Sequence, residues 1–353
     1  MRWLFWIIVI IFACSPSKKP SSTNNVLEEN LQTELGRFLF YDIRISRNQS
    51  KSCGTCHNPK FSFTDGYKRS LGIYADVLQR NTAPLFNLSE LKYLTAADSN
   101  IKTLMQQIDN PLFNNHPMEM GVSGHESEIL ERIKKEKFYK LQFEKLKMSI
   151  NWQNIKLSIT KFVNSLKSYQ SPYDQFLNGK FVMNDQQNRG MKLFFSDSLS
   201  CSKCHGGINF SEPTITNKKN TIDYFYNTGL YNVNEKNEYP QYDIGLSQVT
   251  KNQDDMGKFR VPSIRNLTFT APYYHDGSAE SLMEVIRNYE RGGRLINNGQ
   301  YKGDGFYNRY KHPLIKGFNL STSDRINIVK FLEMLSDTSF IQNPKYIDPI
   351  KIN

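Results

Sequence analysis

Two copies of the pattern Cys-x-x-Cys-His constrain this chain more than any other feature of its sequence. The first lies in KSCGTCHNP, residues 51–59, and the second in CSKCHGG, which begins at Cys201. Cysteine pairs with this spacing serve zinc sites, redox dithiols or covalent haem attachment. A zinc ribbon joins its two pairs within about 15–20 residues, far less than the stretch between these two pairs. A thioredoxin-like dithiol needs a βαβ context, and the sequence around the pairs lacks one.

The histidine behind each pair favours covalent haem. In c-type attachment, each thiol adds to a vinyl group of the porphyrin, and one tight turn bridges the two vinyls. The next residue then lies beneath the iron as an axial ligand. The sequence therefore predicts two c-type haems, with His57 and His205 as iron ligands. The expected attachment residues are Cys53, Cys56, His57, Cys201, Cys204 and His205.

The first residues have the pattern of a secretory signal. Arg2 precedes an apolar run that ends at Ala13, too short for a stable membrane span. The ending Ile-Phe-Ala-Cys resembles the bacterial lipoprotein cleavage box, although an ordinary signal with a chance cysteine is the alternative. We expect a signal peptide at 1–13 and a lipidated tether at 14–26, with Cys14 as the lipid anchor. The body would lie on the periplasmic side of the bacterial envelope and touch a membrane only through this lipid.

Cysteine count and charge limit the remaining possibilities. The chain has five cysteines, so Cys14 and the two motifs leave none for a structural disulfide. It has 45 Lys and Arg against 34 Asp and Glu, a formal net charge of +11. This charge suits an acidic partner or an anionic lipid surface, or is simply a basic soluble surface. No basic-aromatic stripe or nucleic-acid motif occurs, so nucleic acid is not an expected partner.

Hydrophobic periodicity predicts a mainly α fold with long irregular connections. Helices fit 27–39, 129–141, 155–166, 190–195, 281–291 and 322–336, and two strands fit within 206–262. Two segments share a similar sequence pattern, ELGRFLFYDIRISRNQSKSCGTCH and NRGMKLFFSDSLSCSKCH. Both contain a glycine, an apolar pair with Phe, an Asp, a Ser and then the cysteine motif, which indicates an internal repeat. We therefore expect two related, cytochrome c-like haem domains at 27–180 and 181–353.

From Leu35 to Pro349 the sequence resembles the bacterial di-haem cytochrome c peroxidases. Within that family, it looks most similar to the branch that holds the enzyme that matures methylamine dehydrogenase and the methanobactin-associated di-haem enzymes. The resemblance is carried by SCGTCHNPKFSFTDG, QRNTAP, NPLFNNHPMEMG, CSKCHGGINFS, FYNTGLYN, DDMGKFRVPSIRNLTFTAPYYHDGS and EVIRNYERGG. It implies that the N-terminal haem is the peroxide site and that the C-terminal haem handles electron entry.

For the first haem, the resemblance implies an iron that is open on one face. Ile73 stands where many of these peroxidases carry a distal histidine, and an apolar side chain cannot bind iron. Glu119 would be the catalytic acid–base that moves a proton between the two peroxide oxygens. Gln107 would orient water, and Pro111 would pack over the site. From the residues alone, Glu119 would be a solvated loop carboxylate. Three histidines in loops are read as surface residues: His116, His125 and His312.

For the second haem, the resemblance places Tyr289 opposite His205, where the peroxidases carry a methionine and the maturation enzyme a tyrosine. Helical spacing puts Tyr289 on one face with Leu282, Val285 and Ile286. A tyrosinate oxygen would stabilise ferric iron more than a thioether does. The alternatives are a buried core tyrosine, and Met256 as the ligand.

Two further expectations come from the resemblance. The family places a calcium ion between the haems, and hard oxygen donors suit this metal. Its expected ligands are the Asn81 side chain and the backbone carbonyls of Thr270 and Pro272. The tryptophan that bridges the haems in the family is replaced here by Ala96 or Ala97, and Tyr93 could substitute for it.

Three functional hypotheses follow. The first is an oxidoreductase that reduces hydrogen peroxide with electrons from a small carrier, a cytochrome c or a cupredoxin. The second is a high-valent di-haem oxidase that modifies Trp or Tyr of a partner protein. The third is a non-catalytic electron-transfer cytochrome. Tyr289 and Ile73 favour the second and the missing tryptophan favours the first, whereas Glu119 together with Ile73 argues against the third.

Overall fold

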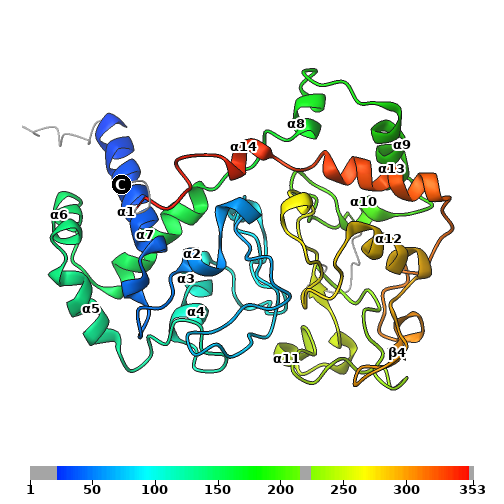
Figure 1. Cartoon of the computed structure of the whole chain (residues 1–353), viewed down its shortest axis with the longest axis horizontal. Coiled ribbons are helices and arrows are strands. Elements are labelled where there is room, and N and C mark those ends of the chain that lie inside the picture. The colour runs from blue at the N-terminus through cyan, green and yellow to red at the C-terminus, as the bar shows by residue number, and fades with distance from the viewer. Residues whose placement is uncertain (1–21, 215–223, 350–353) are drawn as a thin grey trace, which may run out of the picture.

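The computed structural model describes residues 22–214 and 224–349, which fold into two halves that lie side by side (Figure 1). The expected signal peptide, Cys14 and most of the tether fall outside these residues. Within them, no helix combines the length and the apolar character needed to cross a membrane.

Helices dominate both halves, as the periodicity predicts. The first half contains α1 (Ser22–Tyr41), α2 (Cys53–Cys56), α3 (Leu104–Gln107), α4 (Asp109–Phe113), α5 (Glu126–Lys135), α6 (Lys137–Lys145) and α7 (Trp152–Ser165). The rest of the chain contains α8 (Pro172–Leu177), α9 (Asp185–Phe194), α10 (Cys201–Cys204), α11 (Ser247–Thr250), α12 (Leu282–Arg291), α13 (Thr322–Glu333) and α14 (Thr338–Ile341). Two short antiparallel pairs complete the described part, β1 (Phe225–Tyr226) with β2 (Phe259–Arg260) and β3 (Leu295–Ile296) with β4 (Gly303–Asp304).

The predicted helix over 129–141 is wrong in one respect. The backbone of Glu136 is extended, with ψ at 116°, so the segment forms two helices, α5 and α6. Phe138 and Leu141 are therefore exposed, and Tyr139 and Phe143 are buried in their place. A hydrogen bond of 2.5 Å from the Tyr139 hydroxyl to the Asp42 carboxylate fixes this register.

One glycine in each half lets two helices cross closely. On α1, a Cβ added to Gly36 would lie 1.9 Å from the carbonyl oxygen of Ser158 on α7. On α9, a Cβ added to Gly190 would lie 1.9 Å from the carbonyl oxygen of Asn327 on α13. Neither backbone can yield without moving a whole helix, so any side chain at these positions would push the pair apart. Each crossing therefore fixes the position of the helix that precedes a cysteine motif, α1 in the first half and α9 in the second.

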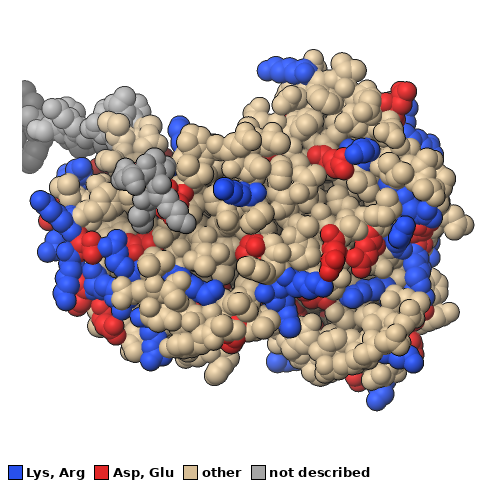
Figure 2. All heavy atoms as spheres, in the orientation of Figure 1, with Lys and Arg blue, Asp and Glu red and all other residues tan. Residues whose placement is uncertain are grey.

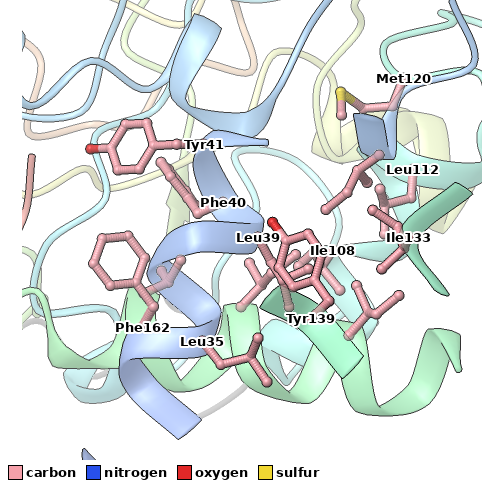
Figure 3. Packing of buried hydrophobic residues seen from close by; sticks show 14 of the residues in the cluster. Leu35, Leu39, Phe40, Tyr41, Ile108, Leu112, Met120, Ile133, Tyr139 and Phe162 are labelled. Atoms are coloured by element: carbon pink, nitrogen blue, oxygen red, sulfur yellow. The ribbon is translucent and has the colours of Figure 1, made fainter. Parts of the chain in front are cut away.

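The two halves have separate hydrophobic cores. The first gathers around α1, where Leu35, Leu39 and Phe40 meet Phe162 and Tyr139 (Figure 3). The second gathers around α9 and α13, with Phe194, Phe331 and Leu335 among its buried members. The proposed domain bounds at 27–180 and 181–353 stay a prediction.

The end of the described chain returns to the first core. Phe340 on α14 is buried there, with its ring centroid 5.7 Å from that of Phe63 and 6.0 Å from that of Phe86. Beyond it, the Tyr41 hydroxyl donates to the Tyr346 carbonyl at 2.6 Å, and the Tyr346 hydroxyl donates to the Ser165 carbonyl at 3.1 Å. In Figure 1 this segment is the red trace that passes above α2 toward α1.

Polar contacts join the halves to each other. Arg80 forms two hydrogen bonds, of 2.6 and 2.8 Å, with the buried carboxylate of Asp243. The Asn81 backbone N–H donates to the His275 carbonyl at 2.8 Å. On the outer face, Lys and Arg lie beside Asp and Glu over both halves (Figure 2). The Arg80–Asp243 pair, whose carboxylate is buried, is thus one of the contacts that join the halves.

Candidate active site

A single cavity of about 500 Å³ contains both cysteine motifs. Side chains from both halves line it. The predicted haem-attachment residues all lie on its wall: Cys53, Cys56, His57, Cys201, Cys204 and His205. The two motifs, far apart in the sequence, therefore face one shared space.

In each motif, the two cysteines lie on a one-turn helix, and the histidine that follows is hydrogen-bonded to a backbone carbonyl. His57 Nδ1 lies 2.8 Å from the Phe63 carbonyl oxygen, and His205 Nδ1 lies 3.0 Å from that of Phe210. A carbonyl only accepts, so Nδ1 is the donor in each ring, and Nε2 is left for a metal. Burial lowers the pKa of both histidines. The rings are therefore neutral, which is the form that ligates iron.

The four thiols suit covalent haem better than the alternative uses. All four are free of disulfides, and burial raises the pKa of Cys53 and Cys201 to about 12. A zinc site or a reactive dithiol needs thiolates with a lowered pKa. Over residues 22–214 and 224–349, no three His, Cys, Asp or Glu side chains are grouped to hold a metal ion. Paired cysteines beside a carbonyl-bound histidine, twice in one apolar-walled cavity, fit two c-type haems.

Glu119 reaches the same cavity from a loop that runs along α4. The Met120 backbone N–H donates to the Pro111 carbonyl at 3.0 Å, which fixes the position of this loop. Burial raises the pKa of the Glu119 carboxyl to about 7, although the charge of Lys51 opposes the shift. A carboxyl with a pKa near neutrality can both take up and return a proton at physiological pH.

Gln107 and Pro111 line the cavity together with Glu119, as expected from the resemblance. The Asn110 side-chain amide donates to Gln107 Oε1 at 3.3 Å. Ile73 does not line the cavity. It is buried behind the Glu119 loop, where a Cβ added to Gly121 would lie 2.6 Å from the Ile73 Cδ1. Ile73 therefore supports the loop rather than facing the first haem position.

Tyr289 lines the cavity from α12, on the side of the second motif. The predicted inward face of this helix is confirmed, because Leu282, Val285, Ile286 and Tyr289 all lie on the cavity wall. Burial raises the pKa of the Tyr289 phenol, so only a nearby positive charge such as ferric iron would make it a phenolate. Met256 packs outside the cavity against the cluster around Tyr239. The geometry thus favours Tyr289 over Met256, and the iron bond itself stays a prediction.

The three expected calcium ligands also lie on the cavity wall. They are Asn81, Thr270 and Pro272. The Asn81 side-chain N–H donates to the Tyr67 carbonyl at 2.7 Å, so its amide oxygen is the group that a cation would take. The calcium ion stays a prediction.

Arg260 was missed in the sequence, although it stands within the stretch DDMGKFRVPSIR. Its guanidinium donates to the carbonyls of Thr95 and Val261 at 3.2 and 2.9 Å, and its backbone N–H donates to the Ala96 carbonyl at 2.7 Å. Burial lowers the pKa of Arg260 to about 10. It lines the cavity, and within the described ranges no carboxylate pairs with it. A buried cation needs a counter-charge, and a haem propionate would supply one.

Two histidines in the cavity wall were also missed. His312 was expected at the surface, but it is half-buried and contacts the Tyr226 ring edge-on at 4.9 Å. His275 stacks on Phe259 with ring centroids 3.6 Å apart. The partners of both rings stand far away in the sequence, so no local signal predicts their burial. His116 is exposed, as expected.

Comparison with known proteins is consistent with this geometry. Residues 30–181 match the family model described as di-haem cytochrome c peroxidase. The chain is 30% identical over 275 residues to the cytochrome c551 peroxidase of Nitrosomonas europaea, covering 77% of this chain and 75% of that one. It is 28% identical over 328 residues to the methylamine utilization protein MauG of Methylorubrum extorquens, covering 91% and 82%. The crystal structure of a MauG-like protein associated with microbial copper homeostasis superposes with a TM-score of 0.86 at 34% identity, covering 98% of this chain and 99% of that one.

Proposed function

Because the chain belongs to the di-haem cytochrome c peroxidase family, whose members carry two c-type haems, we propose that it reduces hydrogen peroxide to water. The electrons would come from a small donor protein, a cytochrome c or a cupredoxin. The observation that supports this most is Glu119, a carboxyl with a pKa of about 7 in the cavity that also contains His57.

In this mechanism, the residues of the chain bind two haems and move one proton. His57 and His205 would hold the irons, and the four motif cysteines would fix the porphyrins. The bound haems supply the redox chemistry. The Glu119 carboxylate takes the proton from one peroxide oxygen and returns it to the oxygen that leaves as water. Gln107 orients the small molecules beside Glu119.

A second candidate is the oxidation of a Trp or Tyr side chain of a partner protein. It is supported by Tyr289, an oxygen donor on the wall of the second haem position, and by the similarity to MauG and the MauG-like protein. Alanine at the position of the bridging tryptophan weakens this candidate, because the two haems would share charge less readily.

The proposal includes three further features. The halves would be two cytochrome c-like domains, 27–180 and 181–353, related by a repeat. The matched helix crossings at Gly36 and Gly190 support this. A calcium ion would bind Asn81, Thr270 and Pro272. The signal-like start of the sequence supports a lipoprotein that is anchored through Cys14 on the periplasmic side of the envelope.

The test is to add hydrogen peroxide to the ferric holoprotein, as isolated, and to follow the Soret band. A rapid change is expected in the wild type and in Glu131→Gln, an exposed control on α5, whereas Glu119→Gln should be slow. Reduced cytochrome c or a reduced copper protein then separates catalytic turnover from a single slow oxidation. No spectral change in the wild type would leave the electron-transfer cytochrome as the function.

A further inference from the structure

A series of tyrosine rings leads from the cavity toward the surface of the second half. We call Tyr239, Tyr231, Tyr301 and Tyr242 the tyrosine series. Tyr239 is buried and lines the cavity. The ring centroids of successive members lie 5.5, 5.8 and 6.0 Å apart. Tyr301 and Tyr242 are half-buried, so the series ends where solvent and other proteins can reach it.

Ring contacts at these distances are common in protein cores, so packing alone does not make the series functional. Tyr231 differs from an ordinary core tyrosine because its hydroxyl donates a hydrogen bond to a carboxylate oxygen, Asp276 Oδ2. Asp276 is buried, and its other oxygen accepts the Ser278 backbone N–H at 3.1 Å. The Arg294 guanidinium lies 4.0 Å from Asp276 Oδ2 and 5.4 Å from the centre of the Tyr231 ring.

The Asp276 carboxyl is ionised and ready to accept the phenolic proton. Burial acts to raise its pKa, but His275, the Tyr231 hydroxyl and the Arg294 charge together hold the pKa below its usual value. The phenol of Tyr231 keeps its proton at rest, because burial and the Asp276 charge raise its pKa. The pair is therefore a neutral phenol joined to a carboxylate.

Tyr239 has no such acceptor. Its hydroxyl donates to Asn227 Oδ1 at 2.9 Å and accepts the Leu230 backbone N–H at 3.1 Å. An amide oxygen does not take up a proton at neutral pH. Tyr239 therefore connects the cavity to Tyr231 through its ring, and Gly257 makes room for that ring, since an added Cβ would lie 2.1 Å from it.

We propose that Tyr231 is a redox-active residue that passes electrons from the surface end of the tyrosine series, through Tyr239, to the peroxide-oxidised site. The inference rests on the proposed function, in which hydrogen peroxide supplies the oxidising equivalents. The series runs outward from the second haem position and does not replace the missing tryptophan between the haems. Its half-buried end is where an electron-donating protein would deliver electrons.

The step balances for one electron and one proton. Tyr231 loses an electron to the oxidised site, its O–H bond breaks, and the proton moves to Asp276 Oδ2. The products are a neutral tyrosyl radical and a carboxylic acid. An electron-donating protein at the half-buried end then supplies one electron, which reaches Tyr231 by way of Tyr242 and Tyr301, and Asp276 returns the proton to Tyr231, so that every member of the series ends in its starting state. Two such transfers match the two electrons that one peroxide takes up.

The test is to mix the ferric holoprotein with hydrogen peroxide without a donor, freeze it within milliseconds and record the electron paramagnetic resonance spectrum. A tyrosyl radical is expected, and tyrosine deuterated on the ring should narrow its signal. Tyr231→Phe and Asp276→Asn should each lower the radical yield at least tenfold. Asp276→Glu keeps a carboxylate and should restore it, and Tyr307→Phe, an exposed ring outside the series, should leave it unchanged.

The Soret change of the same samples separates this inference from the proposed function. If the Soret band responds but no tyrosyl radical forms, or if Tyr231→Phe keeps the full radical yield, the role of Tyr231 is refuted and the peroxidase proposal stands. A wild-type protein whose Soret band does not respond refutes both. Haem content and thermal unfolding of each variant show whether a lost radical comes from a lost fold.

Discussion

In the proposed peroxide reaction, the pKa of Glu119 would set how the rate depends on pH. As a base, this carboxyl must be ionised when peroxide arrives, and burial holds its pKa at about 7, against an ordinary value of 4.5. Raising the pH through 7 therefore increases the rate. A group with a pKa of about 7 is about 1% ionised at pH 5 and about 10% ionised at pH 6.

The magnitude distinguishes a buried Glu119 from a solvated one. With the pKa at about 7, the rate constant at pH 5 should lie about 100-fold below its plateau. A carboxyl at its ordinary pKa would be about three-quarters ionised at pH 5, and the rate would fall by less than about twofold. Lys51→Met removes the charge that lowers the pKa of Glu119, so the midpoint should move to higher pH, whereas Lys51→Arg should keep it.

The assay is stopped-flow measurement of the Soret change with excess peroxide between pH 5 and 9. Glu119→Gln should lower the plateau by about 10²- to 10⁴-fold and remove the midpoint near 7, as the loss of an acid–base group does. Glu131→Gln should behave as the wild type. A wild-type profile that is flat from pH 5 to 8, or a midpoint that survives in Glu119→Gln, would refute the assignment.

Three other substitutions test separate parts of the structure. Tyr289→Phe removes the phenol oxygen from the second haem position, so the reduction potential of one haem should rise; a spectroelectrochemical titration measures it, and an unchanged potential would mean that Tyr289 does not bind iron. Gly36→Ala places a methyl group on the Ser158 carbonyl and should lower the free energy of unfolding by about 3 kcal/mol or more. Gly66→Ala meets no atom within 4 Å and should cost only the strain of its left-handed backbone, about 1–2 kcal/mol; equal losses in urea denaturation would contradict the close crossing. Asp174→Asn breaks a buried pair in which Arg265 donates at 2.8 and 2.9 Å and should cost about 3–5 kcal/mol, whereas Asp324→Asn at the surface should change stability far less. Similar melting curves for these two variants would contradict the burial argument.

Local sequence was sufficient wherever spacing alone decides the structure. The cysteine motifs follow from covalent chemistry, and α7 follows from Ile155, Ile159 and Phe162, which share one buried helical face. The inward face of α12 was predicted for the same reason. Glu119 and Gln107 line the same cavity, but only the family resemblance distinguished Glu119 from a solvated loop carboxylate.

Contacts between distant segments decided the rest. The break between α5 and α6 depends on Tyr139 reaching Asp42, and no pattern within 129–141 indicates that partner. His312 lies in the cavity wall, where its ring packs against Tyr226. No local pattern places Arg260 in the cavity wall, and the packing of β2 beside Ala96 brings it there. These side chains owe their position to tertiary contacts, which override local preference.

The return of the chain end to the first core has a consequence for biogenesis. Phe340 packs on Phe63, and the carbonyl of Phe63 orients the ring of His57. A ribosome makes the first attachment motif long before it makes Phe340. The first porphyrin pocket therefore cannot reach its mature shape while the polypeptide is still being synthesised, and a nascent chain that stops short of α14 leaves that pocket unfinished.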